Sequence, residues 1–166
     1  MQAIQSPIEL YAHAIAIERE AAERYSELAE RMDDEGREEL ARVFGELAHM
    51  EAEHLETLER RTEGLALPAI PVDRYHWLEH GAPETARHDL VFRLMTPRQA
   101  LAIALAAERR AQAFFEAVSW SAADPALRSL AREMLAEERS HVELVTRMLE
   151  ATPPPLGGTI VFDRED

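Results

Sequence analysis

The chain has 166 residues, 46% of them hydrophobic and 30% charged, with a formal net charge of -14 at pH 7. Its length suits a single domain with a buried core, and its acidic balance argues against binding nucleic acid or an anionic membrane through bulk electrostatics. The sequence contains no cysteine, which excludes disulfides, zinc–thiolate sites, iron–sulfur clusters and cysteine nucleophiles within these residues.

The sequence shows no sign of a membrane span or a secretory signal. No stretch approaches the roughly 18 consecutive apolar residues of a spanning helix, and residues 1–10 lack a basic start followed by an apolar run. We therefore expect a soluble, cytoplasmic protein that binds neither membrane nor nucleic acid. Low aromatic content with abundant Ala, Glu, Leu and Arg favours an all-α fold.

Two helices are predicted in the first half of the chain. The first spans about residues 6–32 and opens with Ser-Pro-Ile-Glu, which supplies a capping Ser, a Pro at the first helical position and a Glu three residues after the cap. The second begins near Asp33 or Asp34 and runs to about Thr62, with Gly64 just beyond it as a stop signal.

Two more helices are predicted in the second half. The third spans about residues 96–120 and opens with Thr-Pro-Arg-Gln, the same order of capping residues. The fourth spans about residues 124–151, opens with Asp-Pro and ends at a run of three prolines. The two halves therefore predict two helical hairpins built on one repeated plan.

The segments outside the hairpins complete the predicted architecture. Residues 63–95 contain three prolines and cannot form one helix, so they act as a long crossover between the hairpins. We expect one domain over residues 1–151, a four-helix bundle, followed by a tail at 152–166. Within the tail, Thr-Ile-Val-Phe at 159–162 could form a short strand or docking arm, or could be disordered.

Six residues form a doubled pattern, in which a lone Glu alternates with Glu-x-x-His: Glu18, Glu51, His54, Glu108, Glu138 and His141. They interrupt otherwise apolar stripes with steps of three and four residues, near the middle of each helix. Residues three apart share a helix face, so each Glu-x-x-His can hold one metal ion from one side. Four-helix bundles hold two metal ions in their cores with this ligand set.

The charges of the six residues favour the same interpretation. Four buried carboxylates repel one another, and each loses several kcal/mol of hydration, so they must share protons or be neutralised by cations. Two divalent ions balance four Glu, and two neutral His complete the ligand set. Carboxylate and imidazole suit iron or manganese, although zinc binds at least as tightly. We therefore predict two divalent metal ions per chain, and the ligand types alone leave iron, manganese and zinc open.

Four residues near the pattern have less certain roles. Tyr25 lies seven residues after Glu18 on the same face, where it could hydrogen-bond a ligand carboxylate, relay an electron, or simply fill the core. Other acids, such as Glu20 and Glu137, are expected on solvated faces. His13 lies off the main apolar stripe and is expected at the surface.

At these residues the chain resembles the ferritin-like superfamily, and most nearly the rubrerythrin family. The resemblance covers about residues 6–150 and rests on the six pattern residues together with Tyr25. It implies a ferritin-like four-helix bundle that forms a homodimer and holds a di-iron site reactive toward peroxide or dioxygen. Rubrerythrins tend to carry an additional Glu one turn from the third-helix ligand, where this chain has Leu105 and Ala111. They typically also carry a Cys-rich rubredoxin domain that delivers electrons, so here such a donor would be a separate protein such as a rubredoxin, or would be absent.

The leading functional hypothesis is a di-iron oxidoreductase in which two Fe(II) ions each give one electron to peroxide. Glu51 and Glu138 would bridge the metals, Glu18 and Glu108 would be terminal ligands, and each metal would take one His. One alternative is a ferroxidase, an iron-storage protein or an iron carrier. Another is a non-catalytic interaction domain whose metals only hold the bundle together.

Overall fold

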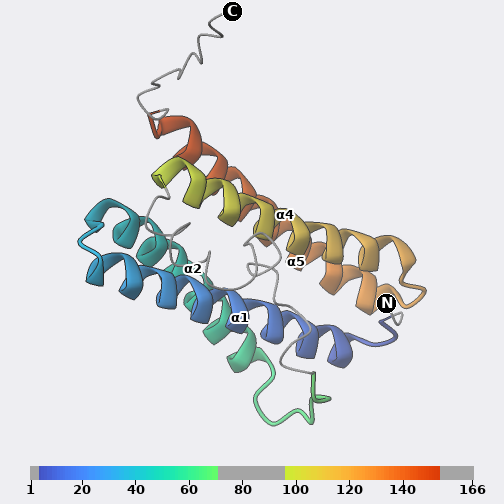
Figure 1. The fold of residues 1–166 in the computed structure, drawn as a ribbon. Helices are drawn as coiled ribbons and strands as arrows, with labels where there is room; N and C mark the ends of the chain where they lie inside the picture. Colours follow the sequence, from blue (N-terminus) through green and yellow to red (C-terminus); the bar gives the residue numbers. More distant parts are fainter. Residues whose placement is uncertain (1–3, 71–95, 154–166) are drawn as a thin grey trace, which may run out of the picture.

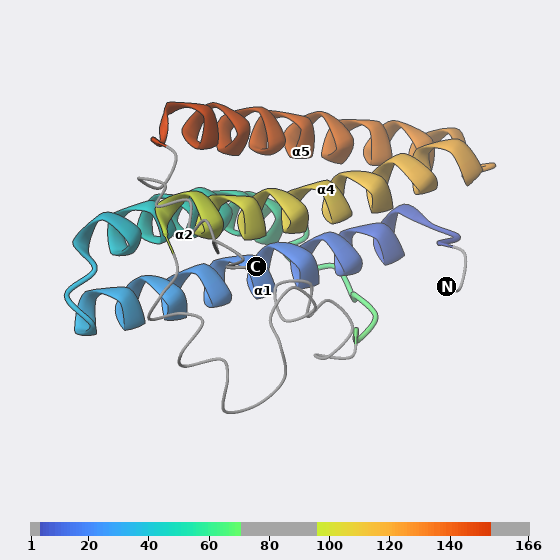
Figure 2. The same cartoon turned by 45° about the horizontal axis from the view of Figure 1, so that its top comes forward.

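The computed structural model describes residues 4–70 and 96–153 of the chain. Within these residues it forms the helices α1 (Pro7–Asp34), α2 (Glu38–Arg61), α4 (Pro97–Ser121) and α5 (Pro125–Ala151). The helices pack as two hairpins, α1 with α2 and α4 with α5 (Figure 1). Seen after a 45° turn, all four run lengthwise side by side (Figure 2). The predicted all-α, four-helix architecture is confirmed.

Several predictions lie outside the described residues. They include the course of the crossover beyond Ile70 and the strand or docking arm at 159–162. The division into a domain over 1–151 and a separate tail therefore stays a prediction. None of the described helices combines the length and the apolar character that crossing a membrane requires.

Local signals at the helix starts act as the sequence predicts. The side chain of Ser6 accepts a hydrogen bond from the backbone N–H of Glu9 at 3.2 Å. Thr96 and Gln99 form a reciprocal capping box at the start of α4, and the side chain of Asp124 caps α5. Each cap satisfies backbone N–H groups that have no partner within the helix, and so fixes where the helix begins.

The start of α2 is the exception, because this helix begins four or five residues later than predicted. α1 continues to Asp34, and the chain then turns through Gly36, whose φ of +70° lies in the left-handed region that glycine tolerates best. α2 begins at Glu38 without a side-chain cap. Gly64, the predicted stop, also has a positive φ, of +78°. Backbone turns thus bound α2 at both ends, whereas side-chain caps mark the starts of the other three helices.

The apolar core consists of two clusters, one toward each end of the bundle. In α1 the first cluster extends to Ile17 and the second begins at Tyr25. In α5 the first cluster ends at Leu135 and the second contains Val145. The predicted ligand positions fall between the two clusters in all four helices. Packing at both ends therefore holds the middle of the bundle in place.

His13 is buried, with 2% of its surface exposed, and its prediction as a surface residue was wrong. Its ring packs against Phe114, with the ring centroids 5.9 Å apart. The flanking Ala12 and Ala14 are buried as well. The N-terminal half of α1 thus buries a wider face than the single apolar stripe indicates.

Candidate metal centre

The structure brings the predicted ligands together in the middle of the bundle. Five of the six are at most 4% exposed: Glu18, Glu51, Glu108, Glu138 and His141. His54 differs, since 29% of its side chain is exposed. Glu and His are rarely buried without partners. Five such residues between two apolar clusters therefore indicate a binding site and not side chains that only fill the core.

His141 lies at the meeting point of three carboxylates. Its Nδ1 is 3.4 Å from Glu108, 3.5 Å from Glu51 and 3.7 Å from Glu138. One ligand atom each from Glu51, Glu108 and His141 lies within 4.8 Å of the others. Glu18 joins this group through a hydrogen bond with the carboxyl group of Glu51. Side chains of all four helices thus meet at one point.

His54 extends from this centre to the surface. Its Nε2 lies 3.2 Å from Nε2 of His141, and the two rings meet edge to face with centroids 4.6 Å apart. Its Nδ1 lies 3.9 Å from the carboxylate of Glu137, which raises the pKa of His54. Glu137, expected on a solvated face, is 33% exposed and directs its carboxylate toward this imidazole.

Tyr25 hydrogen-bonds a predicted ligand and also fills the core. Its hydroxyl donates to Oε1 of Glu108 at 2.7 Å, and its ring stacks 6.2 Å from that of Phe44. Burial, together with the nearby carboxylates, raises the pKa of Tyr25 well above its usual value. The side chain therefore stays a neutral phenol that donates to the ligand.

The electrostatics of the cluster fit a bound cation. Burial raises the pKa of Glu18, and burial together with neighbouring carboxylates raises the pKa values of Glu51 and Glu138 strongly. One oxygen of each of these three residues (Oε2 of Glu18, Oε1 of Glu51 and Oε2 of Glu138) and Nδ1 of His141 make no hydrogen bond within the described part of the chain. Leaving a buried polar group unsatisfied costs about 1–3 kcal/mol. Converging carboxylate and imidazole atoms of this kind fit iron, manganese or zinc.

A small cavity of about 20 Å³ adjoins the carboxylates of Glu51, Glu108 and Glu138. It is large enough for about one water molecule. Ala111, at the position where rubrerythrins tend to carry the additional Glu, lines this cavity. Glu20 lines it too and is only 13% exposed, although the sequence places it on a solvated face. Glu20 lies three residues after the buried Ile17, so the two side chains share one face of α1. This spacing is the sequence signal that Glu20 faces inward.

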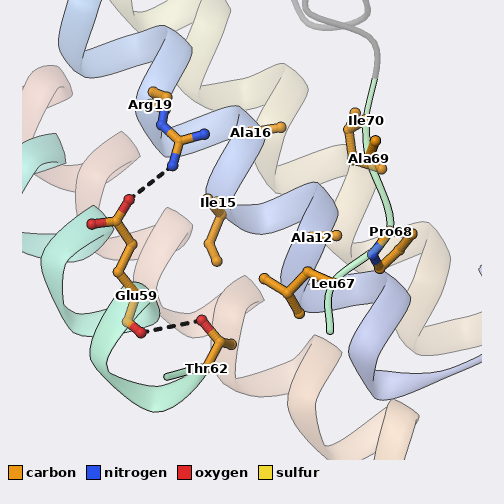
Figure 3. Close-up of a pocket in the computed structure, with 10 residues that line it drawn as sticks. All are labelled: Ala12, Ile15, Ala16, Arg19, Glu59, Thr62, Leu67, Pro68, Ala69 and Ile70. Atoms are coloured by element: carbon orange, nitrogen blue, oxygen red, sulfur yellow. Dashed lines mark hydrogen bonds and ion pairs between the residues drawn. The ribbon is translucent and has the colours of Figure 1, made fainter. Parts of the chain in front are cut away.

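A different cavity, of about 440 Å³, lies between α1 and the segment that follows α2 (Figure 3). Its walls are mostly apolar, and its two charged side chains, Arg19 and Glu59, pair with each other at 2.8 Å. Figure 3 shows this pair at one edge, with Leu67, Pro68 and the residues after them opposite α1. The cavity offers no carboxylate–imidazole set, so the candidate centre remains the cluster between the four helices.

Comparison with known proteins identifies the family. The family model described as Rubrerythrin matches residues 9–95, which is more than half of the chain. The chain belongs to the rubrerythrin family. The matched part contains all of α2 and all but the first two residues of α1, and with them Glu18, Tyr25, Glu51 and His54. The family resemblance drawn from the sequence is thereby confirmed.

A solved structure extends the similarity to both hairpins. It is the crystal structure at 2.00 Å of an uncharacterized conserved protein from Magnetospirillum magnetotacticum MS-1. The similarity covers 90% of this chain and 97% of that one, with 33% sequence identity and a TM-score of 0.76. A search of curated proteins finds no match. The rubrerythrin assignment thus rests on a family match to the first hairpin and a structural match across the bundle.

Proposed function

We propose that this rubrerythrin-family protein is a di-iron oxidoreductase that oxidises Fe(II) while reducing peroxide or dioxygen. The observation that carries the proposal is the buried group formed by Glu51, Glu108 and His141, whose ligand atoms converge within 4.8 Å. Atoms in this group without hydrogen-bond partners supply lone pairs for a metal ion. Family membership supports iron and redox chemistry over a purely structural role.

The positions of the residues support a division of roles among the ligands. Glu51 hydrogen-bonds Glu18 on one side and lies 3.5 Å from His141 on the other, as a bridging carboxylate would. Glu138 would be the second bridge. Glu18 and Glu108 would be terminal ligands, and His54 and His141 would each serve one metal.

The residues around the ligands also contribute to the proposed reaction. A bound di-iron(II) centre supplies two electrons, which with two protons convert hydrogen peroxide to two water molecules. Carboxyl groups such as Glu51 and Glu138 must give up their protons when the metals bind, so loading releases protons to solvent. Tyr25 holds Glu108 in one orientation by its hydrogen bond. The oxidised centre would be reduced again by a separate electron-transfer protein such as a rubredoxin.

The test is an anaerobic Fe(II) titration of metal-free protein, followed by rapid mixing with peroxide and, separately, with dioxygen. We expect saturation at two irons per chain and faster oxidation by peroxide. Faster oxidation by dioxygen, or iron uptake that continues past two per chain, would replace the peroxidase proposal with a ferroxidase or storage function. The absence of tight two-iron saturation would overturn the di-iron centre itself.

A further inference from the structure

The cavity of about 20 Å³ beside the ligands approaches the surface at α1. Most of its lining is buried and comes from all four helices: Ile17, Glu51, Ala107, Glu108, Ala111 and Glu138. The two lining residues that are not buried are Glu20 and Ala21 of α1. The side chain of Glu20 is 13% exposed, so its carboxylate lies between solvent and the cavity. This position distinguishes Glu20 from the four buried Glu of the candidate centre.

The inner end of the cavity offers ligand atoms for a cation. Oε1 of Glu51 and Oε2 of Glu138 make no hydrogen bond within the described residues, and both side chains belong to residues that are 2% exposed. The cavity holds about one water molecule, and a bare divalent cation is smaller than that. A cation bound by Glu20 would therefore have the ligand oxygens on the far side of one small cavity.

The surroundings of Glu20 allow it to take up a cation from solvent. Nε of Arg24 lies 3.6 Å from Oε1 of Glu20, and the guanidinium of Arg24 also donates to Glu27 at 2.9 Å. Arg24 is 29% exposed and Glu27 is 65% exposed, and ion pairs near the surface contribute little stability. A divalent cation has twice the charge of a guanidinium and can replace Arg24 at Glu20, while Arg24 keeps Glu27 as a partner.

The surface cavity of about 170 Å³ beside His54 is the alternative approach to the centre. Its lining includes the acidic Glu53 and Glu137 but also the cationic Arg61. Of the six predicted ligands, His54 alone lines it, and none of the four ligand carboxylates does. The cavity beside Glu20 is lined by three of those carboxylates, and so it offers a cation the more direct approach.

We propose that Glu20 is a transit site for divalent cations, which binds the incoming ion at the surface and passes it through the small cavity to Glu51, Glu108 and Glu138. A transit site is crossed in both directions, so it speeds the entry and the release of the ion by the same factor. A resident ligand would instead change the affinity. This inference rests on the metal binding in the proposed function, and not on its redox chemistry.

The test is rapid mixing of metal-free protein with excess Co(II), monitored by absorbance, followed by release of the bound Co(II) into a chelator. A carboxylate that focuses the field on a cation commonly raises its association rate about ten-fold or more, so Glu20→Gln should slow association about ten-fold. Release should slow by the same factor, and the Kd from an equilibrium titration should stay unchanged. Glu20→Asp keeps the carboxylate and should recover most of the rate. Arg24→Gln should bind Co(II) at least as fast as wild type.

Two further variants serve as matched controls. Glu23→Gln removes an exposed charge from the same helix, and Glu53→Gln removes an acidic residue from the cavity beside His54. Both should bind Co(II) at the wild-type rate. An unchanged Kd in Glu20→Gln shows that its fold and its metal centre are intact.

The inference is overturned if Glu20→Gln associates at the wild-type rate, or if Arg24→Gln or Glu53→Gln slows association equally. It is also overturned if Glu20→Gln weakens the affinity without slowing release, because Glu20 would then be a resident ligand. If wild type binds Co(II) tightly but its Fe(II) form reacts with neither peroxide nor dioxygen, the proposed oxidoreductase function fails while the transit site stands. A wild type that binds no Co(II) would overturn both.

Discussion

The two hairpins carry the same ligand pattern in sequence but present it differently in space. In the α4–α5 hairpin, His141 is buried among carboxylates, and Glu108 accepts a hydrogen bond from Tyr25. In the α1–α2 hairpin, His54 is 29% exposed and faces a carboxylate at the surface. A duplicated set of ligands has thus become an asymmetric centre.

The residues beside the ligands are not duplicated, and they differ between the two hairpins. Tyr25 stands seven residues after Glu18, but the matching position after Glu108 is Phe115, which has no hydroxyl. Glu137 directly precedes one Glu-x-x-His, but the matching residue before the other is Met50. The comparison indicates that the ligands determine which metals can bind, whereas their neighbours determine how each half of the centre behaves.

Removing the residue shared by both halves should have the largest effect. Glu51 contacts Glu18 from one hairpin and His141 from the other, so under the proposed function Glu51→Gln removes a charge that both metals would need. We expect the variant to lose two-iron saturation and oxidant-driven turnover. Iron content after anaerobic loading, measured by elemental analysis, checks this result.

The matched control for this variant is Glu56→Gln, an exposed Glu on the same helix. It changes the net charge equally but should bind iron as wild type does. If Glu51→Gln also retained two irons per chain, Glu51 would not be a bridging ligand and the proposed centre would need a different residue in that role.

Removing one histidine at a time should separate the two halves. His141→Ala deletes an imidazole that lies near three carboxylates, so we expect it to remove one metal ion and to weaken binding of the other. His54→Ala deletes the exposed imidazole, so it should reduce the stoichiometry to one tightly held ion. Co(II) titration monitored by absorbance distinguishes these results, and equal losses in the two variants would contradict the asymmetry.

The fold could be predicted largely from local signals. Ser6, Thr96 and Asp124 mark three helix starts because each cap bonds to backbone only two or three residues away. The start of α2 was missed because it depends on the turn at Gly36 and not on a side-chain cap. The hairpins themselves follow from amphipathic periodicity, which needs no information about distant residues.

The site could be predicted only in part. Spacing alone brings Glu138 and His141 to one helix face, because the i, i+3 geometry is local. The contact of Glu137 with His54 was missed because it joins two hairpins, and helix spacing does not define how the hairpins pack. Glu137 lies three residues after the buried Met134, so the two side chains share one face of α5. This spacing was the available signal that Glu137 turns toward the bundle.

The stability of metal-free protein should fall as the pH rises. The pKa values of Glu18, Glu51 and Glu138 are raised in the folded state, mainly by burial. Such groups contribute full stability below the unfolded pKa of about 4.3, and this contribution is lost as the pH rises through the folded value. We expect the melting temperature to decrease between about pH 5 and pH 8, and metal loading to remove most of that slope.

Repulsion among the charges that give the chain its net charge of -14 also lowers the stability of the folded state as the pH rises. The pH dependence of the melting temperature must therefore be compared between a variant of a buried Glu and a variant of an exposed Glu. Glu138→Gln removes a buried ionisable group and should flatten the pH dependence. Glu56→Gln removes one exposed charge and should leave the slope almost unchanged. If the melting temperatures of the two variants depended on pH in the same way, surface charge, and not the buried cluster, would control the pH dependence of stability in metal-free protein.

The smallest expected effect concerns the one hydroxyl that distinguishes the hairpins. Tyr25→Phe removes the hydrogen bond to Glu108 but retains the ring that packs on Phe44. Because Glu108 then loses a buried donor, we expect metal affinity to fall about ten- to 100-fold, mainly for the ion held by the α4–α5 hairpin. Tyr11→Phe, a change outside the cluster on the same helix, is the control in a calorimetric Co(II) titration. If wild type, Tyr25→Phe and Tyr11→Phe bound Co(II) with equal affinity, Tyr25 would only fill the core. The asymmetry of the centre would then depend on the histidines alone.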